Sequence, residues 1–388
     1  MRADDRPGGQ PNAGDENPYL LLTPGPLSTS RGVRRAMLRD WCTWDDEYNA
    51  IVQEIRGELA QLACLKSGAG DEYSAVLMQG SGTFSVESVI GSVIPQDGTL
   101  LVLANGAYGR RIAGIAHALG IENIVHDSPE DAPPDLERLD QALRTDPSIT
   151  HVAVVHCETT TGMLNPIQAI GEIAHKYDCV YIVDAMSSFG GVPLDVRELG
   201  IDYLISSANK CIQGVPGFGF TIARHASYQM LAENKIRPRS LSLDLYDQWQ
   251  TMENLGGKWR YTSPTHTVRA FRQALIELAA EGGIEKRSQR YIANQSALVQ
   301  GMERAGYPAF LSVENQSPII TAFRYPADPA FEFRGLYERL KSAGFVIYPG
   351  KVSTAPTFRV GTIGEVYIED VQALLAAIGD PSKKSPGM

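Results

Sequence analysis

The sequence predicts an α/β fold built on a large, mostly parallel sheet, with a second and smaller α/β domain toward the C-terminus. Short apolar runs are each followed by a polar or glycine-rich turn and then by a helical pattern, which is typical of βαβ units. The runs are continuously apolar, as expected for strands buried on both faces of a parallel sheet. They are SAVLMQ at 74–79, TLLVLA at 99–104, HVAVVH at 151–156, CVYIVD at 179–184 and DYLISSA at 202–208.

The length of 388 residues exceeds what one ordinary hydrophobic core holds, so we expect more than one domain. After about residue 275, helical patterns give way to short strands (PIITAF, FVIYPG, TFRVG) and a last helix, YIEDVQALLAAIG. The predicted division is a disordered lead over 1–18, an N-terminal segment over 19–35 that packs with the small domain, a large domain over 36–275, a small domain over 276–380 and a tail over 381–388.

The composition limits the class of partner and the compartment. The formal net charge is −10 and the lysines and arginines form no cluster, so nucleic acid is not an expected partner. No charge-free stretch reaches the roughly 18 residues of a membrane span, and the polar N-terminus lacks the apolar core of a signal peptide. The cysteines are scattered without a CxxC pair, which favours reduced thiols in the cytoplasm over a disulfide framework or a metal site. They are Cys42, Cys64, Cys157, Cys179 and Cys211.

Ligands bind beyond the carboxyl ends of the strands in such sheets, so the turns after the apolar runs hold the candidate site residues. The first is Gly80–Thr83. Its small residues Ser81, Gly82 and Thr83 let backbone N–H groups and two hydroxyls approach an anion at a helix N-terminus. It is not a Walker A loop, because no Gly-Lys-Ser/Thr follows. A tight turn with an N-cap is the structural alternative to phosphate binding.

Two further turns carry ionisable residues. Asp184 follows four apolar residues, and a carboxylate at the end of a buried strand needs a partner because an unpaired buried charge is costly. Lys210 closes another strand among small residues, where desolvation would disfavour its charge and leave a nucleophilic amine. The structural alternatives are an N-cap or backbone hydrogen bond for the aspartate and a solvent-facing lysine.

A phosphate cup, a strand-end acid and a strand-end lysine on one sheet edge are what pyridoxal phosphate requires. The cup would hold the phosphate, Lys210 would bind the aldehyde covalently, and Asp184 would keep the ring nitrogen protonated. Tyr108, in an Asn-Gly-Ala-Tyr-Gly turn, could stack on the ring, or could simply pack over a turn. Thr159 could bond the phenolic oxygen of the cofactor, or could form an ordinary threonine turn.

At these positions the sequence resembles a known family, the class V aminotransferases of fold-type I, which depend on pyridoxal phosphate. Within that family it is similar to the 2-aminoethylphosphonate–pyruvate transaminases, over roughly residues 19–380. The matching segments are LLTPGPLSTS, CTWDDEYN, QGSGTF, NGAYG, ETTTGMLNP, VDAMSSFGG, ISSANKCIQGVPGFGF, RSLSLDLYDQW, TSPTHT, FVIYPGK and FRVGTIGEVY.

The resemblance implies roles for residues of the large domain. Lys210 would be the Schiff-base lysine and Asp184 the partner of the pyridine nitrogen, while Ser81, Gly82 and Thr83 would hold the phosphate. The implied reaction takes the amino group of 2-aminoethylphosphonate to pyruvate, giving phosphonoacetaldehyde and L-alanine.

The resemblance also implies roles for residues outside these turns. Tyr108 would stack on the cofactor, Thr159 would lie near its ring hydroxyl, and Thr262 would reach the cofactor phosphate of the neighbouring subunit in a homodimer. Arg359 would bind the acidic group of the substrate. An arginine in an apolar strand also needs an anion on physical grounds, either a ligand or an internal ion pair. Lys351 is a hypothetical second cation for the phosphonate.

Three other functions stay open at the level of sequence. An alanine–glyoxylate or serine–pyruvate type aminotransferase would use the same scaffold and the same Lys210 chemistry. A cysteine desulfurase-like lyase needs a thiol on a loop outside the core, and no cysteine follows Cys211, which is fixed beside the lysine. A ligand-binding protein without turnover ranks last.

Overall fold

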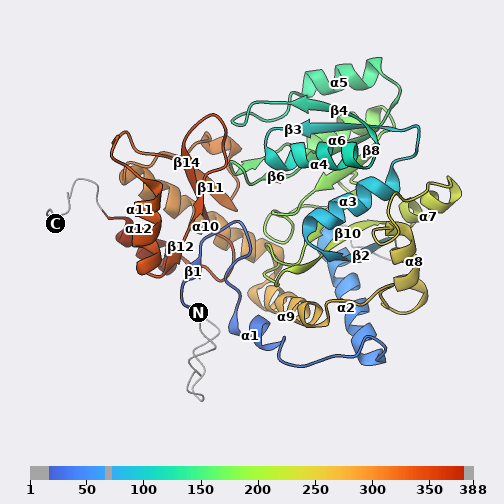
Figure 1. Ribbon diagram of the computed structural model, residues 1–388, viewed down its shortest axis with the longest axis horizontal. Helices are drawn as coiled ribbons and strands as arrows, with labels where there is room; N and C mark the ends of the chain where they lie inside the picture. Colours follow the sequence, from blue (N-terminus) through green and yellow to red (C-terminus); the bar gives the residue numbers. More distant parts are fainter. Residues whose placement is uncertain (1–16, 66–71, 380–388) are drawn as a thin grey trace.

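The computed structural model describes residues 17–65 and 72–379, arranged as a larger and a smaller lobe (Figure 1). Most of the predicted lead, 1–18, and all of the predicted tail, 381–388, lie outside the described residues. Among the helices described, none combines the length and the apolarity that a membrane crossing needs.

The larger lobe is built on a seven-stranded sheet in the order β2-β10-β9-β8-β5-β3-β4. Only β10 runs antiparallel to its neighbours, β2 and β9, so the sheet is mostly parallel, as the sequence predicted. The strands are β2 (Tyr73–Gly80), β3 (Thr99–Ala104), β4 (Glu122–Asp127), β5 (Ile149–Val155), β8 (Val180–Asp184), β9 (Tyr203–Ser207) and β10 (Gly217–Arg224). The five apolar runs correspond to β2, β3, β5, β8 and β9. They did not include β10, or β4 at the edge of the sheet, where only one of the six residues is buried.

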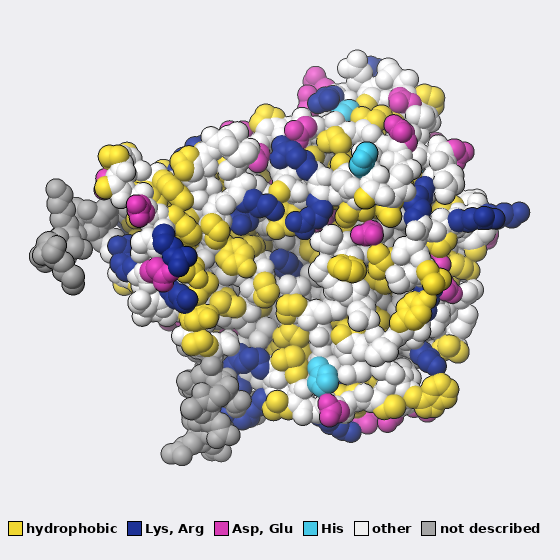
Figure 2. Space-filling model, in the orientation of Figure 1, with side chains coloured by type: hydrophobic (Ala, Val, Ile, Leu, Met, Phe, Trp, Pro, Cys, Tyr) yellow, Lys and Arg dark blue, Asp and Glu magenta, His cyan; other side chains and the backbone are white. Residues whose placement is uncertain are grey.

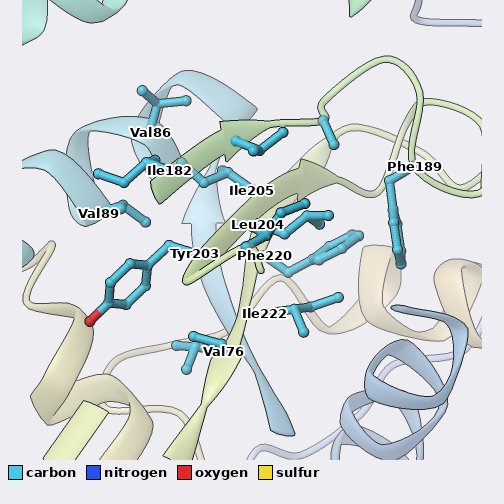
Figure 3. Packing of buried hydrophobic residues seen from close by; sticks show 14 of the residues in the cluster. Val76, Val86, Val89, Ile182, Phe189, Tyr203, Leu204, Ile205, Phe220 and Ile222 are labelled. Atoms are coloured by element: carbon cyan, nitrogen blue, oxygen red, sulfur yellow. The ribbon is translucent and has the colours of Figure 1, made fainter. Parts of the chain in front are cut away.

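Helices cover the sheet and complete its core. α3 packs against β9 and β10, α4 against β3 and β4, α6 against β8, and α2 and α8 against β2. Figure 3 shows Val86 and Val89 of α3 beside Ile182 of β8 and Ile205 of β9. The helices of this lobe are α1 (Arg31–Arg35), α2 (Asp46–Ala63), α3 (Gly82–Val93), α4 (Ala107–Ala118), α5 (Leu136–Thr145), α6 (Ile167–Lys176), α7 (His225–Glu233), α8 (Leu245–Asn254) and α9 (Thr265–Glu281).

The smaller lobe has a core of its own, formed by Leu22 and by residues between 298 and 378. The predicted boundary at 275/276 falls inside α9, and the large core extends to Ile284 on α10, so the domain limits stay a prediction. The elements of the smaller lobe are β1 (Leu20–Leu21), α10 (Gly283–Arg304), η1 (Val313–Asn315), β11 (Ile320–Arg324), α11 (Phe333–Ser342), β12 (Phe345–Val346), β13 (Tyr348–Pro349), β14 (Thr357–Gly361) and α12 (Ile368–Ile378). The short pair β6 (Cys157–Glu158) and β7 (Met163–Leu164) follows β5.

An ion-pair network at the junction of α9 and α10 supports the turn that holds Lys210. Glu281, the last residue of α9, accepts hydrogen bonds from Arg287 at 2.8 Å and from Arg290 at 2.7 Å. Arg287 is buried and donates to the carbonyl of Cys211 at 2.9 Å, directly after Lys210. Burial opposes ionisation of Glu281, but the hydrogen bond from Arg290 and the charge of Arg287 outweigh it and hold its pKa below the usual range.

We therefore expect Glu281→Gln to lower the free energy of unfolding at pH 7 by about 3 kcal/mol, because it leaves two arginines without their anion. The pKa of Glu281 is depressed in the folded state, so its contribution is present above the ordinary glutamate pKa and is lost as the pH falls through the folded value. Urea unfolding at several pH values measures this. The control is Glu285→Gln, exposed on α10; an equal loss in both variants would contradict the prediction.

Candidate active site

A cavity of about 190 Å³ lies at the carboxyl ends of β2, β8 and β9. It is the position that a doubly wound sheet offers to a ligand. The predicted site residues that line it are Ser81, Gly82, Thr83, Tyr108, Asp184 and Lys210. Residues more than 120 positions apart in the sequence thus meet at one edge of the sheet.

The phosphate cup predicted after β2 forms the start of α3. Ser81 is the N-cap residue in an extended conformation, and its side chain makes no capping hydrogen bond. A Cβ atom on Gly82 would lie 2.2 Å from the sulfur of Met186, so no larger residue fits here without movement. The first turn of α3 therefore presents backbone N–H groups and the Ser81 and Thr83 side chains to the cavity, as an anion site requires.

Asp184 ends β8 with its carboxylate buried in the cavity wall. Its Oδ1 accepts a hydrogen bond from the backbone N–H of Met186 at 2.9 Å. Burial raises the pKa of Asp184 to about 6, and the Met186 hydrogen bond only partly offsets this. Within residues 17–65 and 72–379, no lysine, arginine or histidine lies within ion-pair distance of Asp184. A buried carboxylate without a counter-ion favours a cationic ligand in the cavity.

Lys210 lies in the turn after β9, and its amine reaches the segment that joins the two lobes. The Nζ atom donates a hydrogen bond to the carbonyl of Pro24 at 2.6 Å. Burial is the largest influence on its pKa, which is lowered, and the neighbouring acidic groups of Tyr108 and Asp184 oppose that shift. Desolvation thus increases the fraction of unprotonated, nucleophilic amine.

Tyr108 is held in place by a buried carboxylate that the sequence analysis did not single out. Glu158 accepts hydrogen bonds from the backbone N–H groups of Tyr108 at 3.0 Å and of Gly109 at 3.2 Å, at the start of α4. Burial opposes ionisation of the phenol, but a hydrogen bond with Thr159 and the charge of Lys210 outweigh it and lower the pKa of Tyr108. Glu158 lies in the turn after β5, where the sequence predicted site residues. Its hydrogen bonds to the start of α4 could be recognised only from the tertiary structure.

Thr159 and Arg359 meet beside Tyr108. The Nη1 atom of Arg359 donates to the carbonyl of Thr159 at 2.8 Å, and its Nε donates to the carbonyl of Pro349 at 3.1 Å. Arg359 is a buried residue of β14, and burial lowers the pKa of its guanidinium. Neither residue lines the 190 Å³ cavity itself. The buried guanidinium of Arg359, on β14 of the smaller lobe, therefore lies at the edge of the sheet of the larger lobe.

The remaining two candidates lie outside the cavity. Lys351 places its Nζ 4.7 Å from the ring centroid of Tyr108. Thr262 is exposed and lines a separate cleft of about 450 Å³, together with Trp44 and Tyr261. Within this single chain Thr262 is therefore not brought to Lys210.

Ser207 and Arg111 are among the cavity residues that the sequence did not indicate individually as site residues. Ser207, at the end of β9, has a buried hydroxyl without a hydrogen-bond partner in the described chain. Arg111 lies one helical turn after Tyr108 on α4, so helical spacing from that tyrosine could have indicated it. Its Nη1 donates to Thr83 Oγ1 at 3.2 Å.

The similarity to known proteins extends over nearly the whole chain. The family model of the class-V aminotransferases matches residues 34–359. A 2-aminoethylphosphonate–pyruvate transaminase of Syntrophobacter fumaroxidans is 58% identical over 370 residues, covering 95% of this chain and 98% of that protein. The protein of the same name from Vibrio vulnificus is 60% identical over 364 residues, covering 94% and 97%.

Solved structures agree on the fold. An alanine–glyoxylate aminotransferase from a Nostoc species superposes with a TM-score of 0.86 at 24% identity, covering 96% of this chain and 98% of that one. A pyridoxamine–pyruvate aminotransferase from Mesorhizobium loti gives a TM-score of 0.83 at 23% identity, covering 95% and 94%. Together with the family match, the sheet and its edge of polar turns lead to one conclusion: this chain is an aminotransferase and belongs to the class-V aminotransferase family.

Proposed function

We propose that this aminotransferase uses pyridoxal phosphate to transfer the amino group of 2-aminoethylphosphonate to pyruvate, giving phosphonoacetaldehyde and L-alanine. The observation that carries the proposal is the single cavity lined by Lys210, Asp184 and the Ser81–Thr83 turn. The names of the relatives at 58% and 60% identity support the choice of substrates.

The residues around the cavity fit this cofactor. When bound, pyridoxal phosphate supplies an electrophilic aldehyde and a cationic ring that accepts electrons from the substrate carbon. The buried Asp184 carboxylate would hold the proton on the ring nitrogen, and the turn at Ser81–Thr83 would hold the phosphate. The unpartnered hydroxyl of Ser207 offers a further hydrogen bond in the same cavity.

Lys210 would carry out the proton transfers. Its desolvated amine would hold the aldehyde carbon of the cofactor covalently, with loss of water, and the same nitrogen, when it is not bonded to the cofactor, would remove the proton from the substrate carbon as a general base. The carbonyl of Pro24 accepts a hydrogen bond from this amine and so orients it. Tyr108 would stack on the ring, and Thr159 would lie near the ring hydroxyl.

Arg359 would bind the acidic group of either substrate. Two backbone carbonyls occupy its Nε and Nη1 donors, which fixes the guanidinium and leaves further N–H groups for a phosphonate or a carboxylate. A phosphonate carries more charge than a carboxylate, and Lys351 above the Tyr108 ring is the candidate second cation.

A homodimer would complete the site. Thr262 would then reach the cofactor phosphate in the neighbouring subunit. Support comes from the apolar side chains exposed near its cleft: Trp44 is 78% exposed and Tyr261 is 50% exposed, as at surfaces that bury against a partner. Sedimentation should give twice the chain mass of 42.2 kDa, whereas a fully active monomer would contradict the dimer.

We also propose a cytoplasmic location. All five cysteines are unpaired, and four of them are buried. Unpaired buried thiols favour a reducing compartment. Cell fractionation tests this, and recovery of the protein only outside the cytoplasm would contradict it.

The cysteines do not favour lyase chemistry. Cys157 is the only cysteine lining the described part of the cavity, and burial raises the pKa of its thiol to about 12. Burial likewise raises the pKa of Cys211, beside Lys210. A thiol that attacks sulfur must be a thiolate, and both environments disfavour that form.

The substrate assignment is tested by mixing the cofactor-loaded protein with one equivalent of 2-aminoethylphosphonate. We expect the absorbance of the bound cofactor to convert to that of the pyridoxamine form, with release of phosphonoacetaldehyde. Pyruvate should reverse the absorbance change and produce L-alanine. Conversion by alanine or serine but not by 2-aminoethylphosphonate would instead favour an alanine–glyoxylate or serine–pyruvate type enzyme.

The same assay tests the substrate cations. Arg359→Gln should lower kcat/KM for 2-aminoethylphosphonate by about 100-fold, the effect of removing a charged hydrogen-bond donor from a buried anion. Lys351→Ala should reduce kcat/KM more for 2-aminoethylphosphonate than for alanine. Equal reductions of kcat/KM for the two amines would show that Lys351 does not bind the phosphonate.

A glycine beside Lys210 gives a test of the lysine's placement. Gly25 has a φ of +113°, and a Cβ atom there would lie 2.8 Å from both Cδ and Nζ of Lys210. Gly25→Ala should therefore displace the amine and weaken pyridoxal phosphate binding roughly tenfold, measured by absorbance titration. Gly344→Ala is the control, since its φ of +89° gives similar strain with nothing within 4 Å. Equal losses would show that the contact with Lys210 is not responsible.

A further inference from the structure

The cavity lacks an assigned counter-charge for the phosphate that it is proposed to hold. The turn at Ser81–Thr83 offers backbone N–H groups and hydroxyls, which are neutral. Among the described residues that line the cavity, the cations are Lys210 and Arg111. Lys210 is required for the aldehyde, so Arg111 is the one cation left for a dianionic phosphate.

Arg111 lies next to the turn at Ser81–Thr83 that is proposed to hold the phosphate. Its Nη1 donates to Thr83 Oγ1 at 3.2 Å, which brings the guanidinium to a hydroxyl of the cup itself. Its guanidinium carbon lies 4.8 Å from the ring centroid of Tyr108, so the planar group packs on an aromatic ring next to the cavity. Arginine presents several N–H groups in a fixed fork that suits phosphate oxygens.

The neighbouring arginine shows that this arrangement is not a general feature of α4. Arg110 forms ion pairs with Asp127 at 3.0 Å and with Glu130 at 3.8 Å. Within the described ranges no carboxylate lies within ion-pair distance of Arg111. Both arginines are exposed residues, but Arg110 pairs with carboxylates, whereas Arg111 lines the cavity without such a partner among the described residues.

The surroundings also favour an anion. Figure 2 shows several lysine and arginine side chains on the face between α4 and the sheet of the smaller lobe. From these observations we propose that Arg111 binds the phosphate group of the cofactor and supplies its counter-charge. The assignment rests on the proposed function, because it requires pyridoxal phosphate in this cavity.

The test compares cofactors with and without the phosphate. Apo protein is titrated with pyridoxal phosphate and, separately, with pyridoxal, and binding is followed by absorbance. Arg111→Gln should weaken pyridoxal phosphate binding by about 10- to 100-fold, the range of a charge-assisted hydrogen bond, and should leave pyridoxal binding unchanged. Arg111→Lys, which keeps the charge, should recover part of the loss, and Arg110→Gln should match the wild type.

Each other outcome overturns a defined part of the assignment. Equal weakening of both ligands by Arg111→Gln would mean that Arg111 acts through Asp184 or through the fold. Unchanged cofactor binding, with weaker 2-aminoethylphosphonate binding, would move Arg111 to the substrate. If the wild type prefers pyridoxal phosphate and Arg111→Gln keeps that preference, only the role of Arg111 fails. If the wild type binds neither ligand, the proposed cofactor fails as well.

Discussion

Burial of two opposite ionisable groups at one edge of the sheet is the constraint on which the site depends. Desolvation raises the pKa of Asp184 and lowers that of Lys210, so each group is held away from its preferred charge state. A cationic ring would give the aspartate its missing counter-ion, and an aldehyde carbon would react with the neutral amine. The burial that shifts the pKa values of Asp184 and Lys210 is therefore also the origin of the chemistry proposed for the cavity.

The fold maintains this unfavourable arrangement by surrounding it with rigid elements. β8 and β9 are adjacent parallel strands, so the turns that carry Asp184 and Lys210 lie at the same edge. Arg287 fixes the turn after Lys210 through the Cys211 carbonyl, and Glu158 fixes the start of α4 that carries Tyr108. Desolvation of Asp184 and Lys210 is tolerated because well-packed neighbours hold the geometry of the site.

The two lobes contribute different chemical functions. The larger lobe supplies the cavity with its cup, acid and lysine. The smaller lobe supplies Arg359 from β14 and Lys351 from the loop before it, both close to Tyr108. In the proposed function, cofactor chemistry would rest on the sheet of one lobe, and recognition of the substrate's acidic group would depend on how the other lobe packs against it.

The sequence by itself determined most strands of the larger lobe, the mostly parallel sheet and the turns that hold Ser81, Asp184 and Lys210. It could do so because buried parallel strands are continuously apolar and their carboxyl ends share one edge. Only the tertiary structure decided which side chains partner one another. Glu158 caps α4, Arg111 reaches Thr83, and Ser207 faces the cavity without a partner. These contacts join residues far apart in the chain, and local periodicity carries no information about which distant side chains packing will bring together.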